Sequence, residues 1–267
     1  MCSWACSTAF VLRMHLPDPF NLLLLAYLFV LLPLGVYKSA RRFEAMRANR
    51  SAAKAAGRST AGTVPTPTSI YIGTLFNMGI LGALAFMAAY EARLRLFRVD
   101  HFGTREFVAC VVWLVASFSV GRLSRAWRSE AELRDMPMLD LVPRTRRDWL
   151  TFGAVAVVAG VCEEAAYRGM GFNALHWWIS GFPLDGAARV ATPVAALLVA
   201  GAFALAHQVQ GSKSVAIIFV KALLMQVLVW YTGTLVGAMV GHVVLDGLTA
   251  YRSLGLAQRL EANASAS

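Results

Sequence analysis

The chain has 267 residues, of which 58% are hydrophobic and 15% are charged, against roughly 45–50% apolar and about 25% charged residues in soluble globular domains. This composition excludes an ordinary soluble domain and indicates a membrane protein in contact with the lipid bilayer. The net charge of +10 does not indicate nucleic acid as a partner, because the basic residues lie in short loops without interleaved aromatic side chains or a recognised binding motif.

Long uncharged runs predict the transmembrane helices. Residues 19–37, 59–90, 190–212 and 222–245 contain no acidic side chain, lysine or arginine, and each is about as long as the ~20 residues that cross a bilayer core. Backbone amides in lipid must be hydrogen-bonded within their own segment, so each run is expected to be a helix. With the shorter and interrupted runs, we expect an all-α, polytopic membrane protein of about seven transmembrane helices: 19–37, 69–90, 107–121, 149–180, 192–210, 214–231 and 234–250.

The loops between these spans predict their orientation. The stretch 38–58 carries seven basic residues and one acid, so it is expected to continue as a helix on the cytoplasmic side, with the N-terminus outside. Residues 57–68 are rich in Gly, Pro and Thr and predict a loop. The stretch 122–148 carries seven arginines and five acids and is again expected in the cytoplasm. The cysteines lack zinc-site spacing and predict no disulfide framework: Cys2, Cys6, Cys110 and Cys162.

The fourth span contains a cluster of charges, Glu163, Glu164 and Arg168. An ionisable side chain within a span costs about 2.5–3.5 kcal/mol on insertion scales, so such residues usually face a protein-lined cavity and indicate function. Residues i and i+4 share a helix face, so we expect Glu164 and Arg168 to form an ion pair while Glu163 points elsewhere. A carboxylate without a basic partner suits a general acid or base, and a purely architectural ion-pair cluster is the alternative.

The later spans add two histidines and a lysine. His207 follows Phe203 by four residues, so the two rings share a face, and His242 precedes Asp246 by four, so that the carboxylate can fix the tautomer of the imidazole. Each histidine taken alone fits equally well as a satisfied core residue. Lys221 is expected to extend towards the cytoplasmic interface. Taken together, one glutamate and two histidines on three helices can converge and polarise a water, either directly or through a divalent metal.

Three short motifs carry a family resemblance. Residues 163–168 read EEAAYR, residues 203–207 read FALAH and residues 242–246 read HVVLD. In this order they match the EExxxR, FxxxH and HxxxN/D motifs, and residues 150–250 resemble the CAAX-protease and bacteriocin-processing family (CPBP, also called Abi), which includes the Ras-converting CAAX endopeptidases. The residue sequence around the second motif, FALAHQVQG, and the aspartate in the third motif look more like the prokaryotic branch of the family.

The resemblance implies that a peptide bond at or within the membrane is cleaved by an activated water. By this analogy Glu163 is the general base, His207 binds and orients the water, and His242 with Asp246 stabilises the oxyanion. Two further residues support the site, Glu164 and Arg168. The same side chains can also be drawn as ligands of Zn²⁺ or another divalent metal, which would be held by Glu163, His207, His242 and Asp246.

The sequence thus predicts one integral membrane domain with N-terminal helices and basic loops over 1–148, a catalytic core over 149–250 and a short tail over 251–267. The expected partner is a membrane-tethered peptide or protein substrate, and the resemblance implies the plasma membrane of a prokaryote. Two other functions stay open for the same polar cluster: a non-catalytic binding or immunity-type scaffold, and an ion-coupled transporter. The sequence predicts no oligomeric state.

Overall fold

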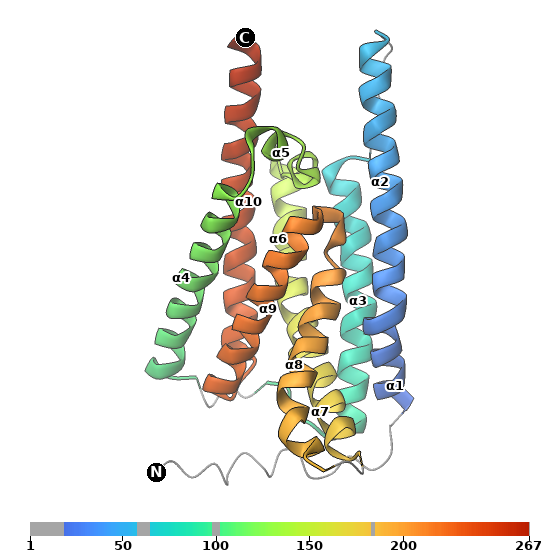
Figure 1. The fold of residues 1–267 in the computed structure, drawn as a ribbon, viewed down its shortest axis with the longest axis vertical. Coiled ribbons are helices and arrows are strands. Elements are labelled where there is room, and N and C mark those ends of the chain that lie inside the picture. The colour runs from blue at the N-terminus through green and yellow to red at the C-terminus, as the bar shows by residue number, and fades with distance from the viewer. Residues whose placement is uncertain (1–18, 58–64, 98–101, 183–184, 267) are drawn as a thin grey trace.

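The computed structural model describes residues 19–57, 65–97, 102–182 and 185–266, and within them all regular elements are helices (Figure 1). The first half contains α1 (Pro19–Ala26), the π-helical turn η3 (Tyr27–Leu31), α2 (Leu32–Ala55), α3 (Pro67–Glu91), α4 (Thr104–Ala126), α5 (Glu130–Arg134) and the 3-10 turn η5 (Pro137–Leu141). The second half contains α6 (Arg146–Glu163), the π-helix η6 (Glu164–Gly171), α7 (Phe172–Ser180), α8 (Ala187–Leu205), the 3-10 turn η7 (Gln208–Gln210), α9 (Ser212–Thr232) and α10 (Val236–Ala266). The expected all-α, polytopic architecture is confirmed. Cys2, Cys6 and most of the loop expected over 57–68 lie outside the described residues.

Six rods among the described residues are long and apolar enough to cross a membrane, one fewer than the seven expected. The expected seventh span, 234–250, is the first half of α10, which packs against α4, α6 and α9. One face of α10 is polar because it lines a cavity through His242, Asp246, Thr249 and Ser253, and this lowers the mean hydropathy of the helix. The residues expected to form a short tail continue α10 as a helix to Ala266.

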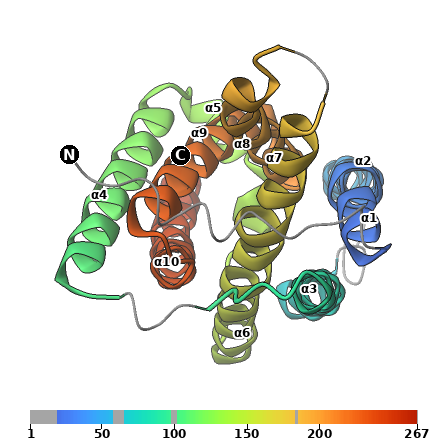
Figure 2. The ribbon, with the colours of Figure 1, turned by 90° about the horizontal axis from the view of Figure 1, so that it is seen from below.

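The long rod α6–η6–α7 runs through the middle of the helix bundle. Seen from below, α3 and the α1–α2 rod lie on one side of it, and α10 and α4 lie on the other (Figure 2). The largest buried cluster joins α1, α3, η6 and α8. The far ends of α2, α4 and α10 lie at the same end of the molecule (Figure 1), and this is the end where the sequence concentrates its basic residues.

Local contacts explain where the central rod begins and how close it comes to α10. Thr145 caps α6, because its hydroxyl accepts a hydrogen bond from Asp148 N (3.1 Å) while the Asp148 carboxylate accepts one from Thr145 N (3.0 Å), a reciprocal capping box. Further along, a Cβ on Gly160 would lie only 2.7 Å from Val243 Cγ2 and 3.0 Å from Met239 O. Glycine at this position therefore lets α6 and α10 approach closely, one turn before the two glutamates.

Two features of the helices differ from regular spans. The rod expected over 149–180 is continuous, as predicted, but its charged motif lies in the π-helix η6, a conformation that occurs frequently at functional sites. The span expected over 192–210 has the predicted length but is shifted five residues towards the N-terminus, because α8 runs from Ala187 to Leu205. His207 therefore lies in the turn after the helix rather than within it.

Candidate active site

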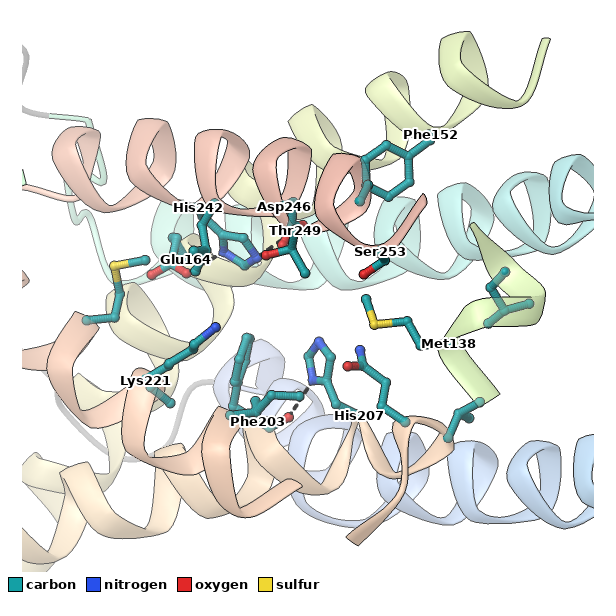
Figure 3. A pocket seen from close by; sticks show the side chains of 18 of the residues that line it. Met138, Phe152, Glu164, Phe203, His207, Lys221, His242, Asp246, Thr249 and Ser253 are labelled. Atoms are coloured by element: carbon teal, nitrogen blue, oxygen red, sulfur yellow. Dashed lines mark hydrogen bonds and ion pairs between the residues drawn. The ribbon is translucent and has the colours of Figure 1, made fainter. Parts of the chain in front are cut away.

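A cavity of about 280 Å³ lies between η6, the end of α8, α9 and α10 (Figure 3). Figure 3 shows His207 and Phe203 on one side of this cavity, across from Glu164, His242 and Asp246. The lining includes five of the six residues predicted from the motifs: Glu164, Arg168, His207, His242 and Asp246. The sixth, Glu163, is buried immediately behind this lining and reaches the site through its contact with His242.

The imidazole of His242 lies between the two glutamates of the first motif. His242 Nδ1 is 2.8 Å from Glu164 Oε1, and His242 Nε2 is 3.5 Å from Glu163 Oε2. A carboxylate can only accept, so Nδ1 carries the hydrogen of the short bond and Nε2 faces Glu163. The two carboxylates point in different directions, as expected, but they meet the opposite nitrogens of one histidine.

The ion pair predicted within the first motif is confirmed. Arg168 Nη1 lies 3.1 Å from Glu164 Oε1, and the side chains are 2% and 0% exposed. Glu164 Oε1 thus joins Arg168 to His242, whereas Glu164 Oε2 has no hydrogen-bond partner among the described residues. A buried charge needs such compensation, so Arg168 and Glu164 together hold the orientation of the His242 ring.

Phe203 is the aromatic centre of the site. Its ring centroid lies 4.7 Å from that of His207 and 6.2 Å from that of His242, and the Arg168 guanidinium carbon lies 4.3 Å from the same centroid. Tyr167 packs edge-on against it at 5.1 Å. The ring therefore fixes both histidines and the arginine relative to one another, which agrees with the shared face predicted for Phe203 and His207.

His207 presents one free ring nitrogen to the cavity. Its Nδ1 lies 2.8 Å from the carbonyl oxygen of Phe203. Because a carbonyl only accepts, Nδ1 donates this bond, and Nε2 of the neutral ring keeps a lone pair. Although the residue lies beyond the end of α8, this hydrogen bond ties the ring to the last turn of the helix. Nε2 can therefore accept a hydrogen bond from a water.

Along α10, the polar face that carries His242 continues into the cavity. Asp246 Oδ2 lies 3.6 Å from His242 Nε2, and the Asp246 side chain is 37% exposed. Thr249 and Ser253 follow at helical spacing and also line the cavity. These two residues were not predicted, although the spacing 242, 246, 249 and 253 is the signal that identifies one face of a helix.

Lys221 is a third lining residue whose place the sequence did not reveal. It was expected to extend towards the cytoplasmic interface, but it lines the cavity from α9, and Figure 3 shows its side chain directed into the space between Glu164 and Phe203. Hydropathy could locate the lysine within a span but could not say which way its flexible side chain turns.

The end of the cavity towards the basic loops is closed by the segment that contains η5. Met138 and Leu141 of this segment line the cavity. The Tyr71 hydroxyl donates a hydrogen bond to Leu141 O, and Arg47 of α2 donates to Asp140 Oδ2 at 2.8 Å. Contacts from α2 and α3 therefore hold this loop segment at one end of the cavity.

The predicted metal ligands do not form a ready-made metal centre. Among the residues that the structure describes, no three His, Cys, Asp or Glu side chains are grouped so that they could hold a metal ion. Glu163 and Asp246 both approach His242 Nε2, whereas His207 lies across the cavity (Figure 3).

Comparison with known proteins identifies the region that carries this site. Residues 145–248, which include the three motifs and the cavity-facing half of α10, match the family described as type II CAAX prenyl endopeptidase Rce1-like. Neither a curated protein nor a solved structure matches the chain. The family match confirms the resemblance predicted from the motifs. Together with six apolar helices, it indicates an integral membrane protein. Residues 145–248 are thus similar to the Rce1-like CAAX endopeptidases, a family of membrane proteases.

Proposed function

We propose that the protein is an intramembrane endopeptidase that hydrolyses a peptide bond of a membrane-associated protein or peptide, using a water activated by glutamate and histidine. The observation that carries the proposal is the pair of histidines on one cavity. His242 is held between Glu163 and Glu164, and His207 directs a free nitrogen towards it from the other side.

The first step is the attack of water on the peptide carbonyl carbon. His207 Nε2 accepts a hydrogen bond from the water and orients it, and Glu163 takes a proton from it as the oxygen forms a bond to carbon. Glu163 lies at the His242 end of the cavity, so the attacking water is expected beside His242 Nε2. General-base catalysis of this kind typically contributes about 10²–10⁴-fold to the rate. The proton taken by Glu163 then moves to the leaving nitrogen as the carbon–nitrogen bond breaks.

The second requirement is a donor for the oxyanion of the tetrahedral intermediate. His242 already donates from Nδ1 to Glu164, so Nε2 of the protonated ring is the donor available to an oxyanion. An ionised Asp246 cannot donate a hydrogen bond, although an asparagine at the same place could. In this chain the role of Asp246 is therefore to support the charge and orientation of His242 from 3.6 Å.

The size and walls of the cavity fit a short peptide segment. Its volume of about 280 Å³ is slightly below the roughly 300–1,000 Å³ of small-molecule pockets. Apolar side chains form much of its wall, among them Trp113, Phe152, Met225 and Leu245. These features support a membrane-tethered peptide as the substrate.

We place the protein in the plasma membrane of a prokaryote, with the cavity nearer the cytoplasmic face.

The test compares the wild type with Glu163→Ala, both purified in detergent and incubated with candidate membrane-tethered peptides. The wild type is expected to cleave, and Glu163→Ala is expected to be slower by at least about 10². Glu130→Gln, which changes an exposed glutamate of α5, is the matched control and should cleave at the wild-type rate. Equal cleavage by the wild type and Glu163→Ala would remove Glu163 from the mechanism.

Two additional arms of the same experiment address the alternatives. Incubation with a chelator, followed by addition of Zn²⁺, separates a metal-assisted reaction from one that uses side chains alone. Measurement of peptide binding separates an enzyme from a scaffold, because a scaffold would bind the peptide without cleaving it in any variant.

A further inference from the structure

The side chain of Lys221 is a cation in the wall of the cavity that pairs with no acid among the described residues. The carboxylate that interacts with it electrostatically is Asp246, which lies 3.6 Å from His242 Nε2. Lys213, two turns earlier on α9, differs in this respect, because its ammonium pairs with Glu132 at 2.6 Å. An unpaired ammonium within a membrane protein is costly, so its place on the cavity wall calls for a ligand of opposite charge.

The surroundings of Lys221 leave room for such a ligand. On one side the lysine packs against Gly121 of α4, where a Cβ would lie 3.6 Å from Nζ in ordinary contact. Its other side faces the cavity, in the space between Glu164 and Phe203 (Figure 3). Ala222 and Met225 on α9 and Trp113 on α4 continue the cavity wall. A bound chain would therefore meet one positive charge beside an apolar wall, on the same cavity as the two histidines.

We propose that Lys221 binds a carboxylate of the peptide substrate and that it determines specificity in this way. The inference rests on the proposed function and goes further, since it names the chemical feature that the site selects. An ammonium is a point charge that pairs well with carboxylates, and a peptide carries carboxylates at its C-terminus and on aspartate and glutamate side chains. The proposed bond-breaking steps use Glu163, His207 and His242, so Lys221 acts on binding rather than on the bond-breaking step.

The experiment measures the binding of one lipid-anchored peptide in three forms to the protein in detergent. The forms are a free C-terminal acid, the corresponding C-terminal amide, and the amide with one aspartate added. Wild type is expected to bind at least one acidic form roughly tenfold or more tightly than the uncharged amide. The preferred form tells whether the carboxylate belongs to the C-terminus or to a side chain.

Three variants assign that preference to one residue. Lys221→Met is expected to abolish the preference for the acidic peptide, and Lys221→Arg to keep it because the charge remains. Lys213→Met is the matched control on the same helix and should keep the full preference. Circular dichroism and gel filtration check that each variant folds, and Lys221→Gln replaces Lys221→Met if the latter does not.

The outcomes separate this proposal from the proposed function. Equal binding of acidic and uncharged peptides by the wild type, or an unchanged preference in Lys221→Met, would overturn the role of Lys221 even if the protein cleaves. A preference that depends on Lys221 without any cleavage would support the carboxylate site and overturn the peptidase. Where cleavage occurs, the loss in Lys221→Met should appear mainly in KM and not in kcat.

Discussion

Replacing Arg168 by methionine is the perturbation whose size follows most directly from the structure. Arg168 is buried, its guanidinium lies 3.1 Å from Glu164 Oε1 and it stacks 4.3 Å from the centroid of the Phe203 ring. Arg168→Met keeps much of the side-chain volume but leaves Glu164 as a buried carboxylate with His242 as its remaining partner. Breaking a buried pair in this way typically lowers the free energy of unfolding by about 3–5 kcal/mol. Because His242 remains, we expect a value near 3 kcal/mol.

The assay is a denaturant titration of the purified protein in mixed micelles, with helix content as the signal. Arg134→Met is the matched control, because Arg134 pairs with Glu130 at the same i,i+4 spacing and at 2.6 Å, but the two side chains are 49% and 64% exposed. Exposed pairs are worth about 0–1 kcal/mol. The double variant Glu164→Gln/Arg168→Met should lose less than the sum of the single variants, since no uncompensated charge remains. A loss below about 1 kcal/mol in Arg168→Met would refute the view that this pair holds the site.

Three other predictions concern packing, pH and catalysis. Gly160→Ala should lower the free energy of unfolding by about 1–3 kcal/mol, because its Cβ would lie 2.7 Å from a side chain of α10. The control Gly153→Ala, whose Cβ would have nothing within 4 Å, should leave the free energy of unfolding unchanged. Equal losses in the two variants would contradict the close contact at Gly160. The Lys213 side chain donates a hydrogen bond to Glu132 and lowers the pKa of that carboxyl from 4.5 to about 2. The stabilisation that ionised Glu132 provides is therefore present above pH 4.5 and is lost as the pH falls towards 2. Thermal melts of wild type and Glu132→Gln should differ at pH 7 and converge at pH 2. His207→Ala should lower kcat by about 10²–10⁴-fold with unchanged helix content, and an unchanged kcat would exclude His207 as the residue that orients the water.

The helical architecture could be predicted because it depends on short-range signals. Uncharged runs of adequate length set the positions of most rods within a few residues, and the basic loops indicated which ends lie together. The seventh expected span, 234–250, forms the first half of α10, and its mean hydropathy is lower than that of the other six because α10 combines exposed apolar residues with polar residues that face the cavity. The end of α8 was placed too late because the sequence after Leu205 stays free of acids, lysine and arginine as far as Ser212, and it contains no proline that would stop the helix.

Within the site, pairs on one helix were predictable and contacts between helices were not. The spacing of Glu164 and Arg168 predicted their ion pair, and the spacing of Phe203 and His207 predicted their shared face. The contact of His242 with both glutamates depends on how α10 is rotated against η6, which no local spacing specifies. The direction of Lys221 likewise depends on its neighbours on α4 and α10.

The close approach of α6 and α10 connects the architecture to the proposed chemistry. A short bond from His242 to Glu164 requires the backbones of η6 and α10 to lie nearer than large side chains permit. Gly160 provides this approach one turn before the motif, and the fully buried Ala165 and Ala166 keep η6 narrow on its packed faces. Small residues in membrane helices are commonly explained by packing alone. Here the same residues also bring two carboxylates within reach of one imidazole, so a larger side chain at Gly160 should displace His242 and impair catalysis, in addition to loosening the bundle.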